Sequence, residues 1–229
     1  MTWTRLLFAH WPVAPDLLRP HIPPQLALET RDGAAWLGVV PFGMSGVRPR
    51  CGVPLPWVSR FLELNLRTYV TAGGKPGVWF FSLDAGNPLA VRAARRWFHL
   101  PYYDAQLSST LMDDELCFTS FRTHRGAPAV RFAAVYAPTD EVTPGRPGTI
   151  EHWLTERYCL YAADPQGQVW RGEIDHRPWP LQRARVAIEC NTMAQPLGLA
   201  LDEAPAWAHY AERLDVLAWP LELLAADET

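Results

Sequence analysis

Residues 61–70 read FLELNLRTYV, and polar or aromatic side chains alternate there with mostly aliphatic ones. Successive side chains of a β-strand point to opposite faces, so this period of two predicts a strand. One face carries the polar residues Glu63, Asn65 and Arg67. Two interpretations of that face stay open: a solvated outer face with salt bridges, or the polar lining of a cavity enclosed by strands.

A second strand is predicted next, at Val78–Leu83, after the turn-like run GGKPG at residues 73–77. Glu63 and Asp84 would then lie near one end of two adjacent strands. Strict alternation would also place Asp84 on the same face as Val78. A helix beginning at Asn87 would follow, and its dipole would favour the ionised form of Asp84.

Similar patterns extend over the whole chain. The expected strands lie at Trp3–Trp11, Ala34–Pro41, Phe61–Thr71, Val78–Leu83, Ala105–Leu111, Leu116–Arg122, Ala129–Tyr136, Arg157–Ala162, Val169–His176, Ala184–Cys190 and Tyr210–Trp219. The expected helices lie at Pro15–Ile22, Asn87–Phe98 and Thr149–Glu156. Many strands and few helices predict a β-dominated α+β fold. No internal repeat or linker is evident, so we expect residues 1–229 to form a single domain.

Composition excludes several classes of function. A net charge of −3 and a pI near 6.2 argue against a nucleic-acid partner, which requires a basic face. No run of 18 apolar residues exists, so we expect no membrane partner. The four cysteines, at positions 51, 117, 159 and 190, are far apart and favour reduced thiols in a cytoplasmic protein. The histidines have no metal-ligand spacing, and we expect neither a metal nor a cofactor.

The basic residues are 20 arginines and one lysine, Lys75. An amine nucleophile that forms a Schiff base needs a desolvated lysine. Lys75 falls in the predicted hairpin turn, where its ammonium would be solvated and protonated. Lysine-based covalent catalysis is therefore not expected.

Several strings resemble the YqjF-like family, the bacterial domain of unknown function 2071. They are FAHWPVAPDLLRPHIPPQLAL (8–28), FLELNLRTYV (61–70), GVWFFSLDA (77–85), LPYYDAQL (100–107), LTERYCLY (154–161) and HRPWPL (176–181). The same layout is more distantly similar to acetoacetate decarboxylase. That resemblance implies an acetoacetate decarboxylase-like β-barrel with a few peripheral helices around a small-molecule cavity. The decarboxylase is itself a standard example of an activated lysine.

The resemblance also implies roles for individual residues. Glu63 matches a pocket glutamate, and Asp84 matches the aspartate of a strand that ends in Leu-Asp. The paired lysines that carry the decarboxylase chemistry fall on Tyr102 and Tyr103. Schiff-base decarboxylation is therefore not carried over to this chain, since fold analogy alone does not establish function.

Two further positions depart from the decarboxylase pattern. The pocket arginine of the first strand falls at Thr4 or Arg5. A second pocket glutamate, expected near Leu37 or Gly38, is missing. The resemblance thus implies a similar scaffold with altered electrostatics.

Each candidate side chain has a structural alternative. Tyr102 and Tyr103 could donate hydrogen bonds to a ligand, and a phenol whose pKa was lowered by Arg67 could act as a general acid. Alternatively, one tyrosine packs in the core and the other covers the surface. His10 could be a cavity acid or base, or a structural histidine bound to a backbone carbonyl. Arg67 could bind an anionic group while Glu63 acts as a base.

We therefore expect a small organic carbonyl or carboxylate molecule in the barrel cavity. Its expected ligand-binding residues are Arg5, His10, Arg67, Asp84 and Tyr103. Glu63 and Tyr102 would perform acid/base chemistry of the lyase or isomerase type without a Schiff base. The alternative is a binding or interaction protein without turnover. Trp-rich barrels often dimerise, so a homodimer also remains open.

Overall fold

The computed structural model describes residues 1–47 and 60–225. Its strands are β1 (Thr2–Val13), β2 (Ala27–Leu28), β3 (Ala35–Ser45), β4 (Arg60–Ala72), β5 (Lys75–Ala85), β6 (Tyr102–Met112), β7 (Glu115–Arg122), β8 (Arg131–Pro138), β9 (Cys159–Ala163), β10 (Val169–His176), β11 (Gln182–Asn191) and β12 (Trp207–Leu223). The helices are α1 (Pro15–Leu18), α2 (Pro88–Trp97) and α3 (Ile150–Thr155), with 3-10 turns η1 (Arg19–His21) and η2 (Gln195–Leu197). The expected β-dominated α+β fold is confirmed.

All eleven expected strands are present within the described residues; the bounds of Val169–His176 match those of β10, and the other strands differ at one or both ends. β2 was missed because its two residues are too few to show a period. The expected helix Pro15–Ile22 divides into α1 and η1, since Pro20 has no backbone N–H to continue an α-helix. Cys51 lies outside the described residues. In the part of the chain that the structure describes, no helix is long and apolar enough to cross a bilayer.

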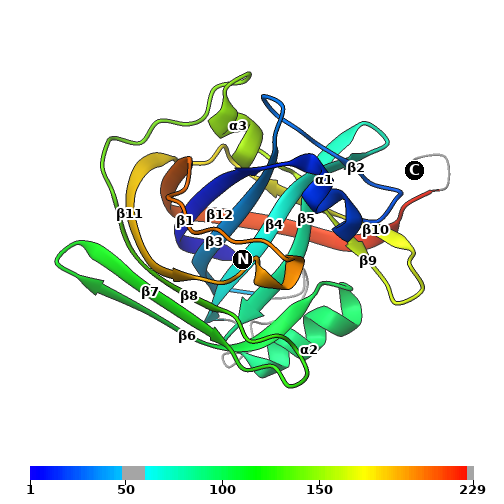
Figure 1. The fold of residues 1–229 in the computed structure, drawn as a ribbon, viewed down its shortest axis with the longest axis horizontal. Helices are drawn as coiled ribbons and strands as arrows, with labels where there is room; N and C mark the ends of the chain where they lie inside the picture. The colour runs from blue at the N-terminus through cyan, green and yellow to red at the C-terminus, as the bar shows by residue number, and fades with distance from the viewer. Residues whose placement is uncertain (48–59, 226–229) are drawn as a thin grey trace.

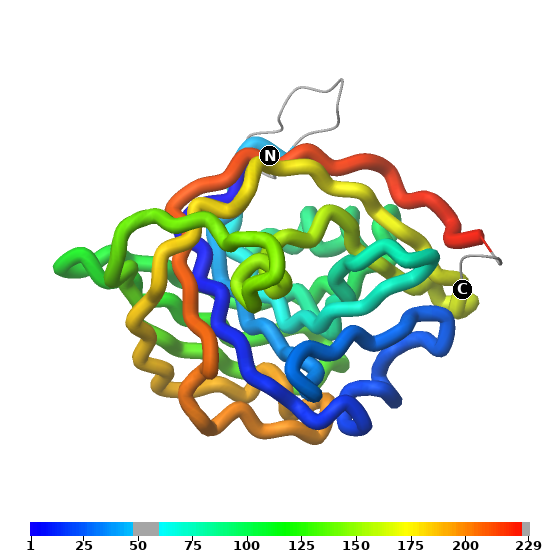
Figure 2. Tube along the Cα trace, turned by 90° about the horizontal axis from the view of Figure 1, so that it is seen from above, coloured from blue at the N-terminus to red at the C-terminus, as the bar shows by residue number. Residues whose placement is uncertain are grey.

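The sheet branches at β5 and β12 and closes on itself twice (Figure 1). One closure, the seven-strand ring, runs β5-β9-β10-β12-β1-β3-β4 and back to β5. The other, the nine-strand ring, runs β5-β6-β7-β8-β11-β12-β1-β3-β4. Figure 2 shows β10 and the C-terminal part of β12 along the top, and β6–β8 to the left. Five strands, β12-β1-β3-β4-β5, therefore separate the two rings.

Because it belongs to both rings, β4 is buried on both faces. Its aliphatic face, including Leu66, shares a core cluster with Phe118 of β7 inside the nine-strand ring. On the polar face Asn65 pairs with Val40 of β3, and Val40 belongs to a second cluster against which Ile174 of β10 packs. Side chains of directly paired residues point to the same side. The polar face of β4 therefore points into the seven-strand ring.

A β-bulge in β5 changes the expected position of Asp84. Arg67 pairs with Phe80 and Leu66 pairs with Ser82, so Phe81 is the extra residue. Beyond the bulge, Asp84 pairs with Leu64 of the aliphatic face. The expectation that Asp84 shares the face of Val78 is wrong, because one inserted residue reverses the alternation.

The two longer helices, α3 and α2, lie towards opposite ends of β4, near the top and at the lower right of Figure 1. Leu154 of α3 packs in one cluster with Tyr69, next to the β4–β5 turn. Val91 of α2 packs in another cluster with Leu83 of β5 and Tyr102 of β6. The polar face is thus shielded from solvent at both ends.

The β5–β9 pairing closes the seven-strand ring, and it depends on a glycine, which has no side chain, at residue 77. A Cβ on Gly77 would lie 2.7 Å from Cys159 Sγ and 2.7 Å from Tyr161 Cε2. These atoms belong to buried residues of β9, which are not free to move aside. The ring closes at this point only because residue 77 is a glycine.

We expect Gly77→Ala to lower the free energy of unfolding by about 1–3 kcal/mol, through overpacking at the β5–β9 pair. Urea unfolding followed by tryptophan fluorescence measures this. Gly86→Ala is the control, because its nearest outside atom would be Leu107 Cδ1 at 3.7 Å. Equal stability of the two variants would contradict the role of Gly77 in the closure.

Candidate functional site

Glu63 and Tyr102 meet inside the fold. The Tyr102 hydroxyl donates to Glu63 Oε2 over 2.7 Å, and the two side chains are 8% and 2% exposed respectively. Burial raises the pKa of Glu63 to about 7, although hydrogen bonds from Tyr102 and Asn65 counteract part of the rise. A carboxyl group with such a pKa exchanges its proton readily near neutral pH, as a general acid or base must.

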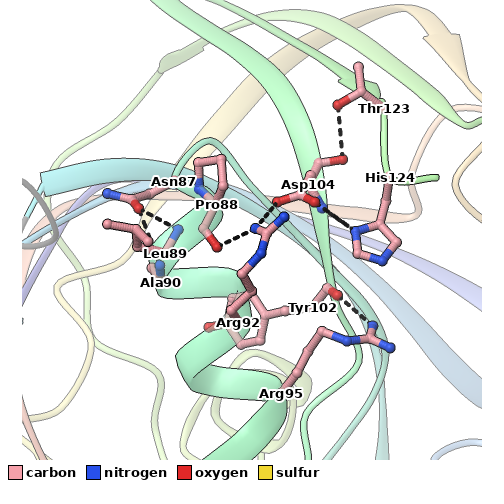
Figure 3. Close-up of polar contacts among 10 residues, drawn as sticks. All are labelled: Asn87, Pro88, Leu89, Ala90, Arg92, Arg95, Tyr102, Asp104, Thr123 and His124. Carbon is pink, nitrogen blue, oxygen red and sulfur yellow. Dashed lines mark hydrogen bonds and ion pairs between the residues drawn. The ribbon is translucent and has the colours of Figure 1, made fainter.

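The backbone around Tyr102 is held from two sides. Tyr102 begins β6, which runs parallel to β5 with Tyr102 beside Leu83. Arg95 of α2 donates from Nη1 to the Tyr102 carbonyl over 2.8 Å (Figure 3). Asp104, two residues on, contacts Arg92 of α2 at 3.4 Å and His124 Nδ1 at 2.9 Å. These contacts fix the start of β6, and with it the direction of the Tyr102 ring.

The pKa of Tyr102 shifts in the direction opposite to the one that we considered from the sequence. Burial raises the pKa of Tyr102 well above its ordinary value, and the Glu63 carboxylate raises it further. Arg67 therefore does not turn Tyr102 into an acid, and that expectation is wrong. Tyr102 keeps its proton as a hydrogen-bond donor, while Glu63 is the group that titrates.

Arg67 lies on the same polar face, further along β4, and is 9% exposed. Its guanidinium carbon is 5.3 Å from the Phe8 ring centroid and 5.9 Å from that of Tyr69. Its Nε has no hydrogen-bond partner. Within the described residues no carboxylate lies within ion-pair distance of Arg67. The interpretation of this face as a solvated surface with salt bridges is wrong, because the seven-strand ring encloses it and buries Glu63, Asn65 and Arg67.

His10 of β1 lies near Arg67 inside the seven-strand ring. Its Nε2 is 2.7 Å from the Tyr69 hydroxyl, and both residues are fully buried. Burial lowers the pKa of His10 well below its ordinary value, and the charge of Arg67 lowers it further. His10 is thus a neutral imidazole bound to a phenol, not to the backbone carbonyl of the structural alternative.

Asp84 and Tyr103 lie on the opposite face of the sheet, in the nine-strand ring. Arg122 of β7 donates from Nε to Asp84 Oδ1 over 2.8 Å, and its guanidinium carbon lies 4.2 Å from the Tyr103 ring centroid. Burial raises the pKa of Asp84 to about 6, although Arg122 lowers it. Burial thus acts against the ionised form of Asp84 that we expected from the helix dipole.

Sequence reasoning did not single out Arg122. The usable signal was the period of two in β7, where Leu116, Phe118, Ser120 and Arg122 share one face and are all buried. An arginine that ends such an apolar series needs a buried partner. Asp84 is that partner.

Arg5 is exposed and lies at an irregularity of the β1–β3 pairing, with φ of 55°. Its carbonyl accepts a bond of 3.1 Å from the Tyr136 hydroxyl. No contact in the described structure joins it to Glu63 or Arg67. The structure thus brings Glu63, Tyr102, Arg67 and His10 to one face and leaves Arg5 outside.

Lys75 is the first residue of β5 and forms an ion pair with Glu173 of β10. It lies beyond Tyr69 on the hairpin, far along the strand from Glu63. Cys159 is buried, and burial raises its thiol pKa to about 11, so it is a poor nucleophile. Among the described residues, no group of histidine, cysteine and carboxylate side chains is arranged to hold a metal ion.

Solved structures with the same arrangement define the fold class. Acetoacetate decarboxylase from Legionella pneumophila matches with a TM-score of 0.64 and 14% identity, over 98% of this chain and 88% of that one. The enduracididine biosynthesis enzyme MppR, solved in complex with pyruvate, matches with a TM-score of 0.67 and 14% identity, over 98% and 89%. The chain therefore has an acetoacetate decarboxylase-like fold.

The family follows from closer sequence similarity. The model of domain of unknown function 2071, described as an uncharacterized conserved protein, matches residues 1–215. The protein YqjF of Bacillus subtilis is 42% identical over 220 residues, covering 96% of this chain and 90% of YqjF. The chain belongs to the domain of unknown function 2071 family.

The raised pKa of Glu63 predicts a specific pH dependence of stability. The folded state holds this proton up to about pH 7, whereas an unfolded glutamate releases it near 4.5. Glu63 therefore makes its full contribution to the free energy of unfolding below pH 4.5. This contribution falls by about 3 kcal/mol as the pH rises to 7. Urea unfolding from pH 4.5 to 8 should show this fall for the wild type relative to Glu63→Gln.

Glu222→Gln, at an exposed position of β12, is the matched control and should follow the wild type. Parallel pH profiles for Glu63→Gln and wild type would show that Glu63 has the same pKa in the folded and unfolded states, which is incompatible with a raised pKa.

Proposed function

We propose that the chain binds a small organic carboxylate or carbonyl compound inside the seven-strand ring, and that Glu63 and Tyr102 perform acid/base chemistry on it. Arg67 would hold the anionic group of the compound. The observation that carries the proposal is the burial of Arg67 without a carboxylate partner in the described structure. A buried charge of this kind is costly unless an anion compensates it.

The residue opposite Arg67 supports this assignment. Gly38 of β3 pairs with Arg67, at the position near which the decarboxylase pattern has its second glutamate. A Cβ there would lie 3.1 Å from His10 Nε2 and 3.3 Å from Arg67 Cγ. The chain therefore supplies no internal anion at this position, which favours an anion brought by a ligand.

The spacing along β4 sets the size of the ligand. Glu63 and Arg67 are four residues apart, about 13 Å between Cα atoms in a strand. The side chains of both residues shorten the gap that a ligand must bridge. A molecule with three to six carbons and an anionic group at one end suits such a site. Pyruvate, the ligand in the MppR complex, is the smallest of this class that we would test.

The chemistry follows from the proton positions. Ionised Glu63 would remove a proton from the carbon next to a ligand carbonyl, and the C–H electron pair would move into the carbonyl group. The Tyr102 hydroxyl would then donate a hydrogen bond to the oxygen that gains negative charge. Return of the proton to another carbon is an isomerisation, whereas expulsion of a leaving group from the neighbouring carbon is a lyase reaction.

The direct test is a thermal-shift screen of oxo and hydroxy acids with three to six carbons, pyruvate included, followed by titration calorimetry. Arg67→Met should weaken binding of any hit by at least about tenfold, or about 1.4 kcal/mol. Without ligand, Arg67→Met should be at least as stable as the wild type, because it removes an uncompensated buried charge. Arg213→Met, at an exposed ion pair with Asp215, is the control and should bind normally.

Turnover of the hit is then followed by NMR. Tyr102→Phe and Glu63→Gln should still bind the ligand but abolish its conversion. Binding without conversion by the wild type would identify a binding protein instead of an enzyme. No binding by the wild type across the panel would refute the proposal.

A separate experiment tests the absence of Schiff-base chemistry. Incubation with pyruvate and borohydride should leave the mass of Lys75 peptides unchanged, because that amine is paired with Glu173 outside the site. Mass spectrometry of the digested protein measures this, with Lys75→Arg as the control. A reduced adduct on Lys75 would contradict the assignment of Glu63 and Tyr102.

A further inference from the structure

A cavity lies beside Trp153 and Arg157, both of which contact the Tyr69 ring. Its volume is about 300 Å³. It is lined by Glu29, Thr30, Pro76, His152, Trp153, Glu156 and Arg157. Glu156 and Arg157 come from the string LTERYCLY, which the acid/base site does not use. A cavity of this volume is at the lower end of ligand pockets and suits a molecule the size of an amino acid.

Arg157 forms a fixed part of this cavity and is 5% exposed. Its Nη1 donates to Glu29 Oε2 over 2.6 Å, and its Nε donates to the Trp153 carbonyl over 2.8 Å. Its guanidinium carbon lies 4.6 Å from the Trp153 ring centroid and 4.9 Å from that of Tyr69. The remaining nitrogen, Nη2, has no partner. The guanidinium is thus held in place with donor capacity left over.

The carboxylates of the cavity are also held in place. Glu156 accepts from the Trp179 backbone N–H over 2.9 Å and from the Tyr158 hydroxyl over 2.5 Å. Glu29 accepts from Arg157. Each carboxylate has more acceptor sites than these bonds fill. The lining therefore combines one guanidinium with two carboxylates, a formal charge of −1 when His152 is neutral.

We propose that this Arg157 cavity binds a small zwitterion of the free α-amino acid class. The ligand carboxylate pairs with the guanidinium of Arg157, and the ligand ammonium pairs with Glu29 and Glu156. A simple anion is disfavoured because two carboxylates repel it, and a simple amine is disfavoured because Arg157 repels it. An apolar molecule would desolvate three charged groups without replacing their hydrogen bonds.

The cavity is distinct from the proposed acid/base site. The residues that line the Arg157 cavity include none of Glu63, Tyr102 and Arg67. The guanidinium of Arg157 lies 4.9 Å and that of Arg67 lies 5.9 Å from the Tyr69 ring centroid. Tyr69 is fully buried and is bound by His10. Amino-acid binding therefore does not depend on a ligand at Arg67, and either proposal can fail alone.

Titration calorimetry with each of the twenty proteinogenic amino acids tests the proposal. At least one should bind. For L-leucine as a hit, 4-methylpentanoate lacks the ammonium and 3-methylbutylamine lacks the carboxylate, so each should bind at least about tenfold more weakly. Equivalent single-charge analogues serve for another hit.

Two variants locate the site. Arg157→Met removes the guanidinium, and Thr30→Trp fills the cavity from an exposed position without removing any charge. Both should abolish binding, and Thr30→Trp keeps the test valid if Arg157→Met does not fold. Arg185→Met, at an exposed ion pair with Glu115, and Arg67→Met should both bind normally.

Three results would overturn the proposal. One is the absence of binding by every amino acid of the panel. Another is binding by Thr30→Trp as tight as by the wild type. The third is equal affinity for the amino acid and its single-charge analogues.

Discussion

Five strands are shared between two closed rings of the same sheet, and this constraint decides where every side chain of those strands points. Alternate residues of β4 face different interiors, so neither face is available to solvent. The bulge at Phe81 reverses the alternation in β5, so the side chain of Asp84 points into the nine-strand ring. As a result Glu63 with Tyr102, and Asp84 with Arg122, lie back to back across one sheet instead of lining a single cavity.

The polar residues inside the seven-strand ring lower the stability of the fold. Burial raises the pKa of Glu63 to about 7 and keeps His10 uncharged, so Glu63 below neutral pH and His10 avoid the penalty for buried charge. Arg67 cannot lose its proton in this way. Arg67 therefore differs from Arg122, whose buried charge is compensated internally by Asp84.

The strand pattern could be read from the sequence because each strand has a short, local period. The two faces of β4 were also assigned correctly from that period, but whether the polar face was outside or enclosed depended on β9 and β10, far along the chain. The bulge at Phe81 has no local signal, which is why Asp84 was grouped with Glu63. Arg122 was visible as the end of an apolar series, yet only the fold supplied its partner.

The shared strands also bear on how the chain is made. β12 is the last strand that the structure describes, and it belongs to both rings. β1 can pair with β3 early, but Thr2 of β1 also pairs with Asp215, so β1 gains its second neighbour only when β12 has left the ribosome. Until then β1 exposes a hydrogen-bonding edge and its apolar face. Synthesis therefore passes through a long interval in which neither ring can close, and chaperone binding would be most valuable then.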